Sequence, residues 1–293
     1  MFHRLLLLSI GLAAILVWVA GVVYALRRFS RRSYQQREHD LEFAVKEAPG
    51  SDRHVESLLA RAPKSKALLG QYTVNAAQRA DWPEALRRAD LFVARLPRSP
   101  GAWLARAKAL RGAGREDEAT AALDKAVRLG PKDPFTLLAW SRDAIRRKEW
   151  NEALRRFDRM RRYAPGWQNP YTEAADALME LGRRDDAEAL LADGMRQQPQ
   201  AWMMWYAAAR IADRAGDLDE AIRRWEDMRT RFPSESAGYH RGAVALERAG
   251  RVEEAAALIR QARDFFPGDK DIAAAAARLA PAAEPEPPET QRT

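Results

Sequence analysis

The pattern of apolar and polar positions divides the chain into one long apolar segment and a series of amphipathic helices. Residues 5–26 form an unbroken run of uncharged residues, LLLLSIGLAAILVWVAGVVYAL. At a rise of about 1.5 Å per residue, a helix of this length spans the roughly 30 Å hydrocarbon core of a bilayer. Beyond residue 40 alanine and arginine are abundant and β-branched residues are sparse, which favours helix. The pattern therefore predicts a transmembrane helix over residues 5–26, followed by an all-α region.

A cleaved signal peptide is the alternative interpretation of the apolar run, because Val23-Tyr24-Ala25 resembles a cleavage site. Two features favour a retained anchor: the run exceeds the usual h-region of about 7–15 residues, and Arg27 and Arg28 would directly follow the cut. Only Arg4 precedes the helix, whereas five arginines follow it within residues 27–40. The positive-inside rule then predicts a single-pass protein of the inner membrane whose helical region is cytoplasmic. The same arginines can contact anionic lipid, or act only as a topology signal.

A strict 34-residue period runs through the rest of the chain. It places seven prolines at equal intervals: Pro63, Pro97, Pro131, Pro165, Pro199, Pro233 and Pro267. Twelve residues before each of the last six prolines stands an alanine, preceded by an acidic residue: Ala85, Ala119, Ala153, Ala187, Ala221 and Ala255. Three columns that keep one period over six units indicate a helical repeat array.

This pattern resembles the tetratricopeptide repeat family, whose 34-residue units carry a bulky residue, a small residue, Ala-x3-large and a final Pro. In units that start at Lys66, position 8 is small: Thr73, Ala107, Ser141, Ala175, Ala209 and Ala243. Position 24 holds Ala89, Leu123, Phe157, Leu191, Trp225 and Ile259. The resemblance implies a right-handed α-solenoid of six hairpins with a partial N-terminal unit and a C-terminal capping helix. Four glycines, Gly114, Gly182, Gly216 and Gly250, fall between the paired helices, where a helix C-cap favours φ > 0.

The chain is accordingly divided into an anchor, a linker, a repeat array and a tail. The tail is rich in Pro and Glu and is predicted to be disordered. The expected segments are an N-terminal flank 1–4, the transmembrane helix 5–26, a basic juxtamembrane linker 27–40, a partial repeat 41–65, six repeats at 66–99, 100–133, 134–167, 168–201, 202–235 and 236–269, a capping helix 270–280 and the tail 281–293.

The composition and the motifs argue against an enzymatic activity and against a metal or cofactor site. There is no cysteine, and four scattered histidines show no metal-ligand spacing. No nucleotide-binding, protease or hydrolase motif occurs. The net charge of +8 is spread along the chain without a nucleic-acid-binding motif. We therefore expect no enzymatic activity, no catalytic, cofactor-binding or metal-binding residues, no cofactor and no nucleic-acid partner.

The resemblance implies that the first helix of each hairpin (helix A) builds a concave groove for a partner protein. A groove of leucine, phenylalanine, methionine and tyrosine among charges suits an extended or helical peptide; a solvated polar groove is the alternative. The Lys/Asn pair by which some family members hold a C-terminal carboxylate is absent, since Gly70 and Val74 stand in those places. The expected partner-binding residues are Leu104, Lys108, Arg111, Phe135, Leu138, Arg142, Arg146, Asp176, Met179, Tyr206 and Arg210.

A second period of 68 residues lies over the first. The motif Glu-Ala-x-Arg-Arg begins at Glu84, Glu152 and Glu220, in alternate repeats only. Because Glu and Arg stand at i, i+3 and i, i+4, local helix pairs account for part of the motif. We interpret it as a solvated convex face inherited from a two-repeat duplication. Trp82 and Trp150, also in alternate repeats, are candidate interface residues, with packing as the alternative.

The order of anchor, arginine cluster and tetratricopeptide array is similar to that of the lipopolysaccharide assembly protein B family. That family's metal-binding cysteine module has no counterpart in this sequence. The likeness implies a membrane-anchored scaffold that recruits or assembles partner proteins at the bacterial inner membrane, in envelope lipid or polysaccharide biogenesis. The alternative is a periplasm-facing chaperone, or an assembly factor for polysaccharide export or cytochrome biogenesis.

Overall fold

The computed structural model describes residues 52–279, and within these residues the chain is an all-α repeat of fourteen helices without strands. The predicted transmembrane helix, basic linker and tail lie outside the described residues. Between Asp52 and Leu279, no helix combines the length and the apolar character needed to cross a membrane.

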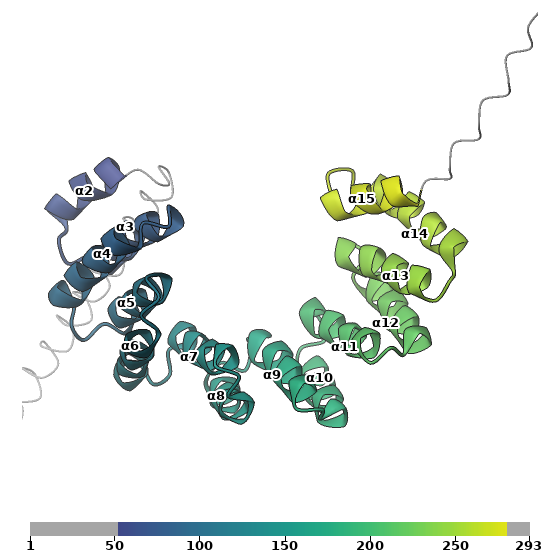
Figure 1. Ribbon diagram of the computed structural model, residues 1–293, viewed down its shortest axis with the longest axis horizontal. Helices are drawn as coiled ribbons and strands as arrows, with labels where there is room; N and C mark the ends of the chain where they lie inside the picture. The colour runs from purple at the N-terminus through teal and green to yellow at the C-terminus, as the bar shows by residue number, and fades with distance from the viewer. Residues whose placement is uncertain (1–51, 280–293) are drawn as a thin grey trace, which may run out of the picture. The chain divides into compact units, whose positions relative to one another are not determined.

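The described residues form two compact units, divided between Trp140 and Ser141. The first unit holds five complete helices and the start of α7 (Pro134–Arg146). The five are α2 (Asp52–Arg61), α3 (Lys66–Gln78), α4 (Trp82–Arg95), α5 (Pro100–Gly112) and α6 (Glu116–Leu129). Helix α2 packs on α3 in the place of a preceding hairpin, and the pairs α3/α4 and α5/α6 are antiparallel hairpins (Figure 1).

The second unit holds the end of α7 and eight complete helices. They are α8 (Trp150–Tyr163), α9 (Asn169–Glu180), α10 (Arg184–Gln197), α11 (Trp202–Arg214), α12 (Leu218–Arg231), α13 (Ser236–Arg248), α14 (Val252–Phe265) and α15 (Lys270–Arg278). The pairs α9/α10, α11/α12 and α13/α14 are hairpins, and α15 covers the free side of α13 and α14.

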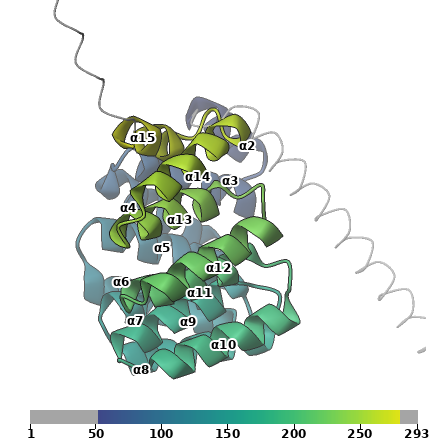
Figure 2. The same ribbon diagram turned by 90° about the vertical axis from the view of Figure 1, so that its right-hand side faces the viewer.

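Each unit has two layers, because the first helices of successive hairpins touch one another whereas the second helices do not; each second helix packs instead on the first helix of the next hairpin, as α4 does on α5 and α12 on α13. In the first unit α3 contacts α5; in the second, α9 contacts α11, α11 contacts α13 and α13 contacts α15. The second helices α10, α12 and α14 do not pack on one another within this unit. They lie side by side on the other face, as Figures 1 and 2 show. Within a unit the helix-A layer is therefore the tighter of the two.

The core consists of the repeat-fixed small and large residues. The alanines twelve residues before each proline, the small residues at position 8 and the residues at position 24 are all buried. Small side chains let the two helices of a hairpin approach, and the position-24 side chains fill the space between hairpins. Phe157 and Trp225 are fully enclosed. Burying an aromatic of this size contributes about 1.5–3 kcal/mol.

The turn inside each of the six hairpins contains one residue with a left-handed backbone conformation, that is, with positive φ. The four glycines expected to cap the first helices have φ of 71–76°. Ala80 and Lys148 occupy the same position with φ of 56° and 57°, although neither is glycine. At Gly114 the amide donates to Arg111 O, and the next amide, of Arg115, donates to Leu110 O, each at 2.9 Å. Both bonds satisfy carbonyls at the end of α5.

Lys148→Gly is expected to stabilise the protein by about 1 kcal/mol, since a side chain at positive φ costs about that much and glycine removes the cost. The midpoint of urea unfolding, followed by helical circular dichroism, measures it. Lys148→Ala keeps a Cβ at the strained position and serves as the control. Equal midpoints for the glycine and alanine variants would contradict the assigned strain.

The arginines of the Glu-Ala-x-Arg-Arg motif do not all lie on a solvated convex face, so that interpretation is wrong for the second arginine of the motif. The first arginine of each motif is exposed, as expected. The second is enclosed in two of the three motifs: Arg88 and Arg156 are buried, and Arg224 is half-buried. A guanidinium is stable there because its five donors meet carboxylates and a carbonyl instead of water.

Arg88 ties three helices together. Its Nε donates to Glu84 Oε1 at 2.6 Å, its Nη2 to Asp52 Oδ2 at 2.7 Å and its Nη1 to the carbonyl of Tyr72 at 2.8 Å. The guanidinium also lies 3.7 Å from the centroid of the Tyr72 ring. Hydrogen bonds from Arg88 hold the pKa of Asp52 well below its usual range. Arg224 repeats the pattern with Glu220, the carbonyl of Ala208 and Glu188.

Candidate protein-interaction surfaces

In the first unit, the predicted groove residues comprise three apolar side chains and two cations. Phe135, in the first turn of α7, is 64% exposed. Leu104 and Leu138 are partly buried, and Leu104 packs on the cluster around Leu110. Lys108 is exposed and makes no hydrogen bond or ion pair within residues 52–279. Arg111 Nε lies 3.6 Å from Glu116 Oε2. Phe135 and Lys108 are thus the most accessible of these five side chains.

In the second unit, the predicted cations are engaged inside the chain. Arg142 donates through Nε and Nη2 to both carboxylate oxygens of Glu173, at 2.6–3.0 Å, and this partner raises the pKa of Arg142. Arg146 pairs with Asp143 of its own helix, a carboxylate that is buried. These two arginines are therefore less available to a partner than the sequence suggests.

Of the remaining predicted residues, Asp176 and Arg210 pair with each other between successive helix-A elements. Arg210 pairs with Asp176, and Arg214 donates to Glu180 at 2.7 Å, in each case 34 residues along the chain. Arg248 pairs with Asp213 in the same way, 35 residues on. An acidic side chain on one hairpin thus meets an arginine on the next. We call these three pairs the ion-pair ladder of the second unit.

Met179 and Tyr206 contribute more to packing than to an open surface. Met179 is partly buried against the cluster that contains Leu178 and Ile211. The Tyr206 ring meets that of Trp225 edge-on at 5.3 Å between centroids, and Arg210 lies 5.8 Å from the Tyr206 centroid.

A hollow of about 470 Å³ opens on the helix-A layer of the second unit. Tyr206, Arg210, Asp213 and Arg214 of α11 line it, together with Arg241 and Arg248 of α13. Of these six residues, only Tyr206 and Arg210 were among those expected to bind a partner. We call this feature the arginine hollow.

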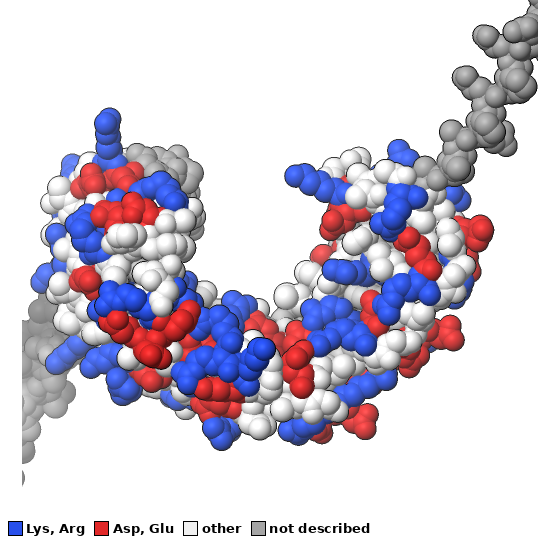
Figure 3. Space-filling model, viewed as in Figure 1, with Lys and Arg blue, Asp and Glu red and all other residues white. Residues whose placement is uncertain are grey.

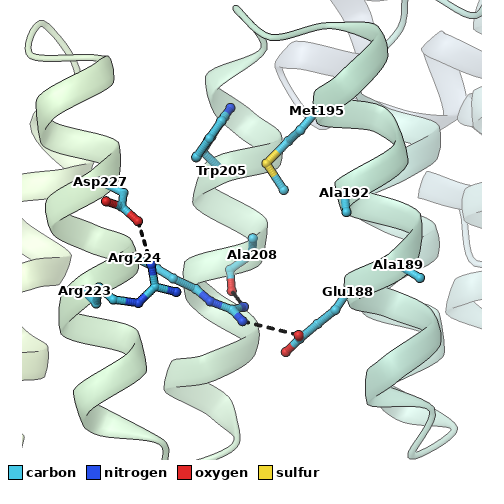
Figure 4. Close-up of a pocket in the computed structure, with 9 residues that line it drawn as sticks. All are labelled: Glu188, Ala189, Ala192, Met195, Trp205, Ala208, Arg223, Arg224 and Asp227. Carbon is cyan, nitrogen blue, oxygen red and sulfur yellow. Dashed lines mark hydrogen bonds and ion pairs between the residues drawn. The ribbon is translucent and has the colours of Figure 1, made fainter.

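A second groove, of about 460 Å³, lies on the opposite layer between α10 and α12. Its floor is apolar, formed by Ala189, Ala192 and Met195 of α10 with Trp205 and Ala208 of α11. Figure 4 shows the charged rim, where Arg224 bridges Glu188 and the carbonyl of Ala208, and Arg223 meets Asp227. The sequence carried a signal for this groove. At positions 22, 25 and 28 the fourth repeat is the only one of the six without a charge.

Trp82 serves packing, which the sequence left as the alternative to an interface role. Its ring lies against the backbone of α5, where a Cβ added at Gly112 would come within 2.1 Å of it. Glycine at this position is therefore required for the close approach of α4 and α5. Trp150, at the same position of the third repeat, is half-buried.

The surfaces carry no arrangement suited to catalysis by a bound metal. Among residues 52–279 no group of three or more His, Asp or Glu side chains is placed to hold a metal ion. Figure 3 shows cations and anions interspersed over the visible face of each unit, without a field of a single sign.

The geometry defines a helical-repeat protein with accessible faces on both layers. Residues 100–143 and 172–236 match tetratricopeptide repeat patterns, so tetratricopeptide repeats are confirmed in the chain. None of the curated proteins matches it in sequence.

Several solved structures share the fold. A tetratricopeptide repeat protein from Parabacteroides merdae is 15% identical with a TM-score of 0.57, over 85% of this chain and 99% of that one. Yeast Tom70 is 17% identical with a TM-score of 0.61, over 85% and 51% of the two chains. PilW, a type IV pilus biogenesis factor, is 19% identical with a TM-score of 0.53, over 71% and 96%. At these identities the likeness is one of fold.

Proposed function

We propose that the protein is a scaffold that binds segments of partner proteins on the helix-A layers of its repeats. The observations that carry this proposal are the exposure of Phe135 and of Lys108 in the first unit; Lys108 makes no hydrogen bond or ion pair within residues 52–279. Exposed apolar side chains mark interaction surfaces, and aromatic anchors supply much of the affinity of protein interfaces. The exposed cation Lys108 favours an acidic-apolar partner segment, chiefly through the rate of association.

The scaffold acts at the bacterial inner membrane in this proposal, held by the apolar segment 5–26. Support comes from the sequence: the run is long enough to span a bilayer, and the arginines that follow it favour a cytoplasmic repeat array. In this proposal the role of the scaffold is to recruit enzymes of envelope lipid or polysaccharide biogenesis to the membrane. A topology reporter fused to the C-terminal side of residue 279 tests the orientation. Activity of a periplasmic reporter would favour the periplasm-facing assembly factor instead.

Partner capture should depend on the exposed aromatic and the lysine. The double variant Lys108→Glu/Phe135→Ser is expected to weaken capture at least about tenfold, since loss of one anchor costs about 2 kcal/mol. Partners are co-purified from detergent-solubilised membranes and quantified by mass spectrometry against the unchanged chain.

The matched control is Arg128→Glu/Phe265→Ser. It changes the same charge and removes a phenylalanine of similar exposure, 61%, from the second helices α6 and α14. Loss of capture in the control with retention in the first variant would place the partner on the other layer. Arg155 and Arg156 are unsuitable as a control, because Arg156 is buried and donates to Glu152 at 2.7 Å.

A further inference from the structure

The groove between α10 and α12 lacks the charges that the other second helices carry on the same face. Ala189, Ala192 and Met195 line it from α10 and follow one another at intervals of three residues along one side of that helix. Each of the other five repeats has a charged residue at one or more of these positions, such as Arg155 and Asp158 in the third. The fourth repeat therefore has an apolar stripe where the others are polar.

The charged side chains at the rim of this groove are engaged with one another. Arg223 donates to both carboxylate oxygens of Glu220, at 2.6 and 2.8 Å, and to Asp227 at 3.0 Å. Arg224 is held by acceptors on three helices, two of which Figure 4 shows. The rim therefore has little to offer the backbone of a ligand, and the floor offers apolar contact.

One cation at the end of the groove has no carboxylate partner among the described residues. Arg231, the last residue of α12, lies one turn beyond Asp227 on the same side of the helix. Its guanidinium carbon lies 4.3 Å from the centroid of the Trp205 ring, and Trp205 lines the groove. The indole covers one face of the guanidinium, whereas the N–H donors lie in its plane. Arg231 is exposed and makes no hydrogen bond or ion pair within residues 52–279, so these donors are free for a carboxylate.

The walls of the groove fit a helix better than an extended chain. An extended segment needs partners for its backbone, and the helices of the wall offer few, because their own backbone groups bond within each helix. A helix satisfies its own backbone and presents apolar side chains at every third or fourth position, which matches the stripe on α10. Small side chains at Ala189, Ala192 and Ala208 let the axis of such a helix approach closely.

We propose that the groove between α10 and α12 binds an amphipathic helix of a partner protein. The apolar side chains of that helix lie on Ala192, Met195 and Trp205, and an acidic side chain one turn beyond them pairs with Arg231. Complementary charge at this end fixes the direction of the bound helix. The site goes beyond the proposed function, because it lies on the layer opposite to the arginine hollow and leaves the helix-A layers free. The scaffold then holds two partners at once.

Selection from a library of displayed random peptides tests the proposal, with the full chain in lipid nanodiscs as the target. Peptides of about 18 residues are long enough to form a helix. Ala189→Arg blocks the groove with the side chain that repeats one, three and five carry at the same position, so the helix tolerates it. Groove ligands are the peptides that bind this variant at least about tenfold more weakly than the unchanged chain. We expect them to share a helical apolar stripe with Asp or Glu one turn beyond it.

Ala257→Arg is the matched control. It makes the same change at the same position of the sixth repeat, on α14, where the alanine is likewise exposed, and the groove ligands should bind it as they bind the unchanged chain. Loss of binding in both variants would mean that added charge, and not a blocked groove, caused the loss, and this would overturn the proposal.

Charge reversal at Arg231 distinguishes the proposed pair from a purely apolar contact. Arg231→Glu is expected to weaken the groove ligands several-fold, and a lysine in place of their carboxylate should restore binding to this variant. A selection that yields no ligand sensitive to Ala189→Arg, or only ligands without the helical stripe and carboxylate, would overturn the proposal. Self-association of the chain, or retention of lipid, that Ala189→Arg abolishes would also overturn it, because a second copy or an acyl chain is then the occupant.

Discussion

Arg88→Ala is expected to lower the free energy of unfolding of the first unit by about 2–3 kcal/mol. The substitution removes the donors that hold Asp52 of α2, the carbonyl of Tyr72 on α3 and Glu84 of α4. The carbonyl loses this donor inside the core, whereas Asp52 keeps Asn75 and Arg79 as partners and Glu84 keeps Arg87. Because both carboxylates remain partly solvated, the cost lies at or below the low end of that for a fully buried pair.

The effect should be local, since each repeat contacts only its neighbours. Hydrogen exchange is therefore the measurement: amides of α2 and α3 should exchange faster in Arg88→Ala than in the unchanged chain, with α13 and α14 unaffected. Arg87→Ala is the matched control, because Arg87 is 61% exposed and pairs only on the surface, with Glu84. It should shift stability by no more than about 0.5 kcal/mol. Similar exchange in the two variants would mean that the buried guanidinium does not hold α2.

Ala209→Leu is expected to destabilise the second unit by about 1–3 kcal/mol, and more than Ala208→Leu. Ala209 is fully buried at the eighth position of α11, where the paired helices are closest. The neighbouring Ala208 lines the groove between α10 and α12, so a larger side chain has room there. Melting temperatures of the two variants, followed by circular dichroism, measure the difference. Equal values would contradict the assigned register of α11.

The helical repeat was predictable because it depends on residues that recur within one unit. Alanine where helices touch, a large residue at position 24 and a terminal proline each have a local steric reason. The left-handed turns at Ala80 and Lys148 were missed, because only a glycine signals positive φ from sequence. At these two turns the hairpin geometry overrides the preference of the residue.

Contacts between side chains of successive repeats were harder to predict. Arg88 pairs with Asp52, which lies 36 residues earlier, and Arg210 pairs with Asp176, which lies 34 residues earlier. From the sequence alone these arginines are expected on a solvated surface, because the acidic residues that they pair with lie about one repeat earlier in the chain. The motif that recurs every 68 residues did contain a signal of buried arginines. A buried guanidinium needs a fixed set of acceptors and therefore a fixed sequence around it. The partner-binding residues of the expected groove remain a prediction.

The half-buried arginine of the fifth repeat suggests that the array changes length in steps of two hairpins. Arg224 belongs to an odd-numbered repeat, yet one of its carboxylates, Glu188, belongs to the even-numbered repeat before it. Excision of residues 202–235 would remove the arginine and leave Glu188 beside the sixth repeat, which has Leu258 at the position of Arg224. Excision of residues 168–235 would take donor and acceptor together. Gain or loss of 68 residues thus keeps such a pair intact, so the heritable unit of this solenoid is the pair of hairpins, twice the length of its structural repeat.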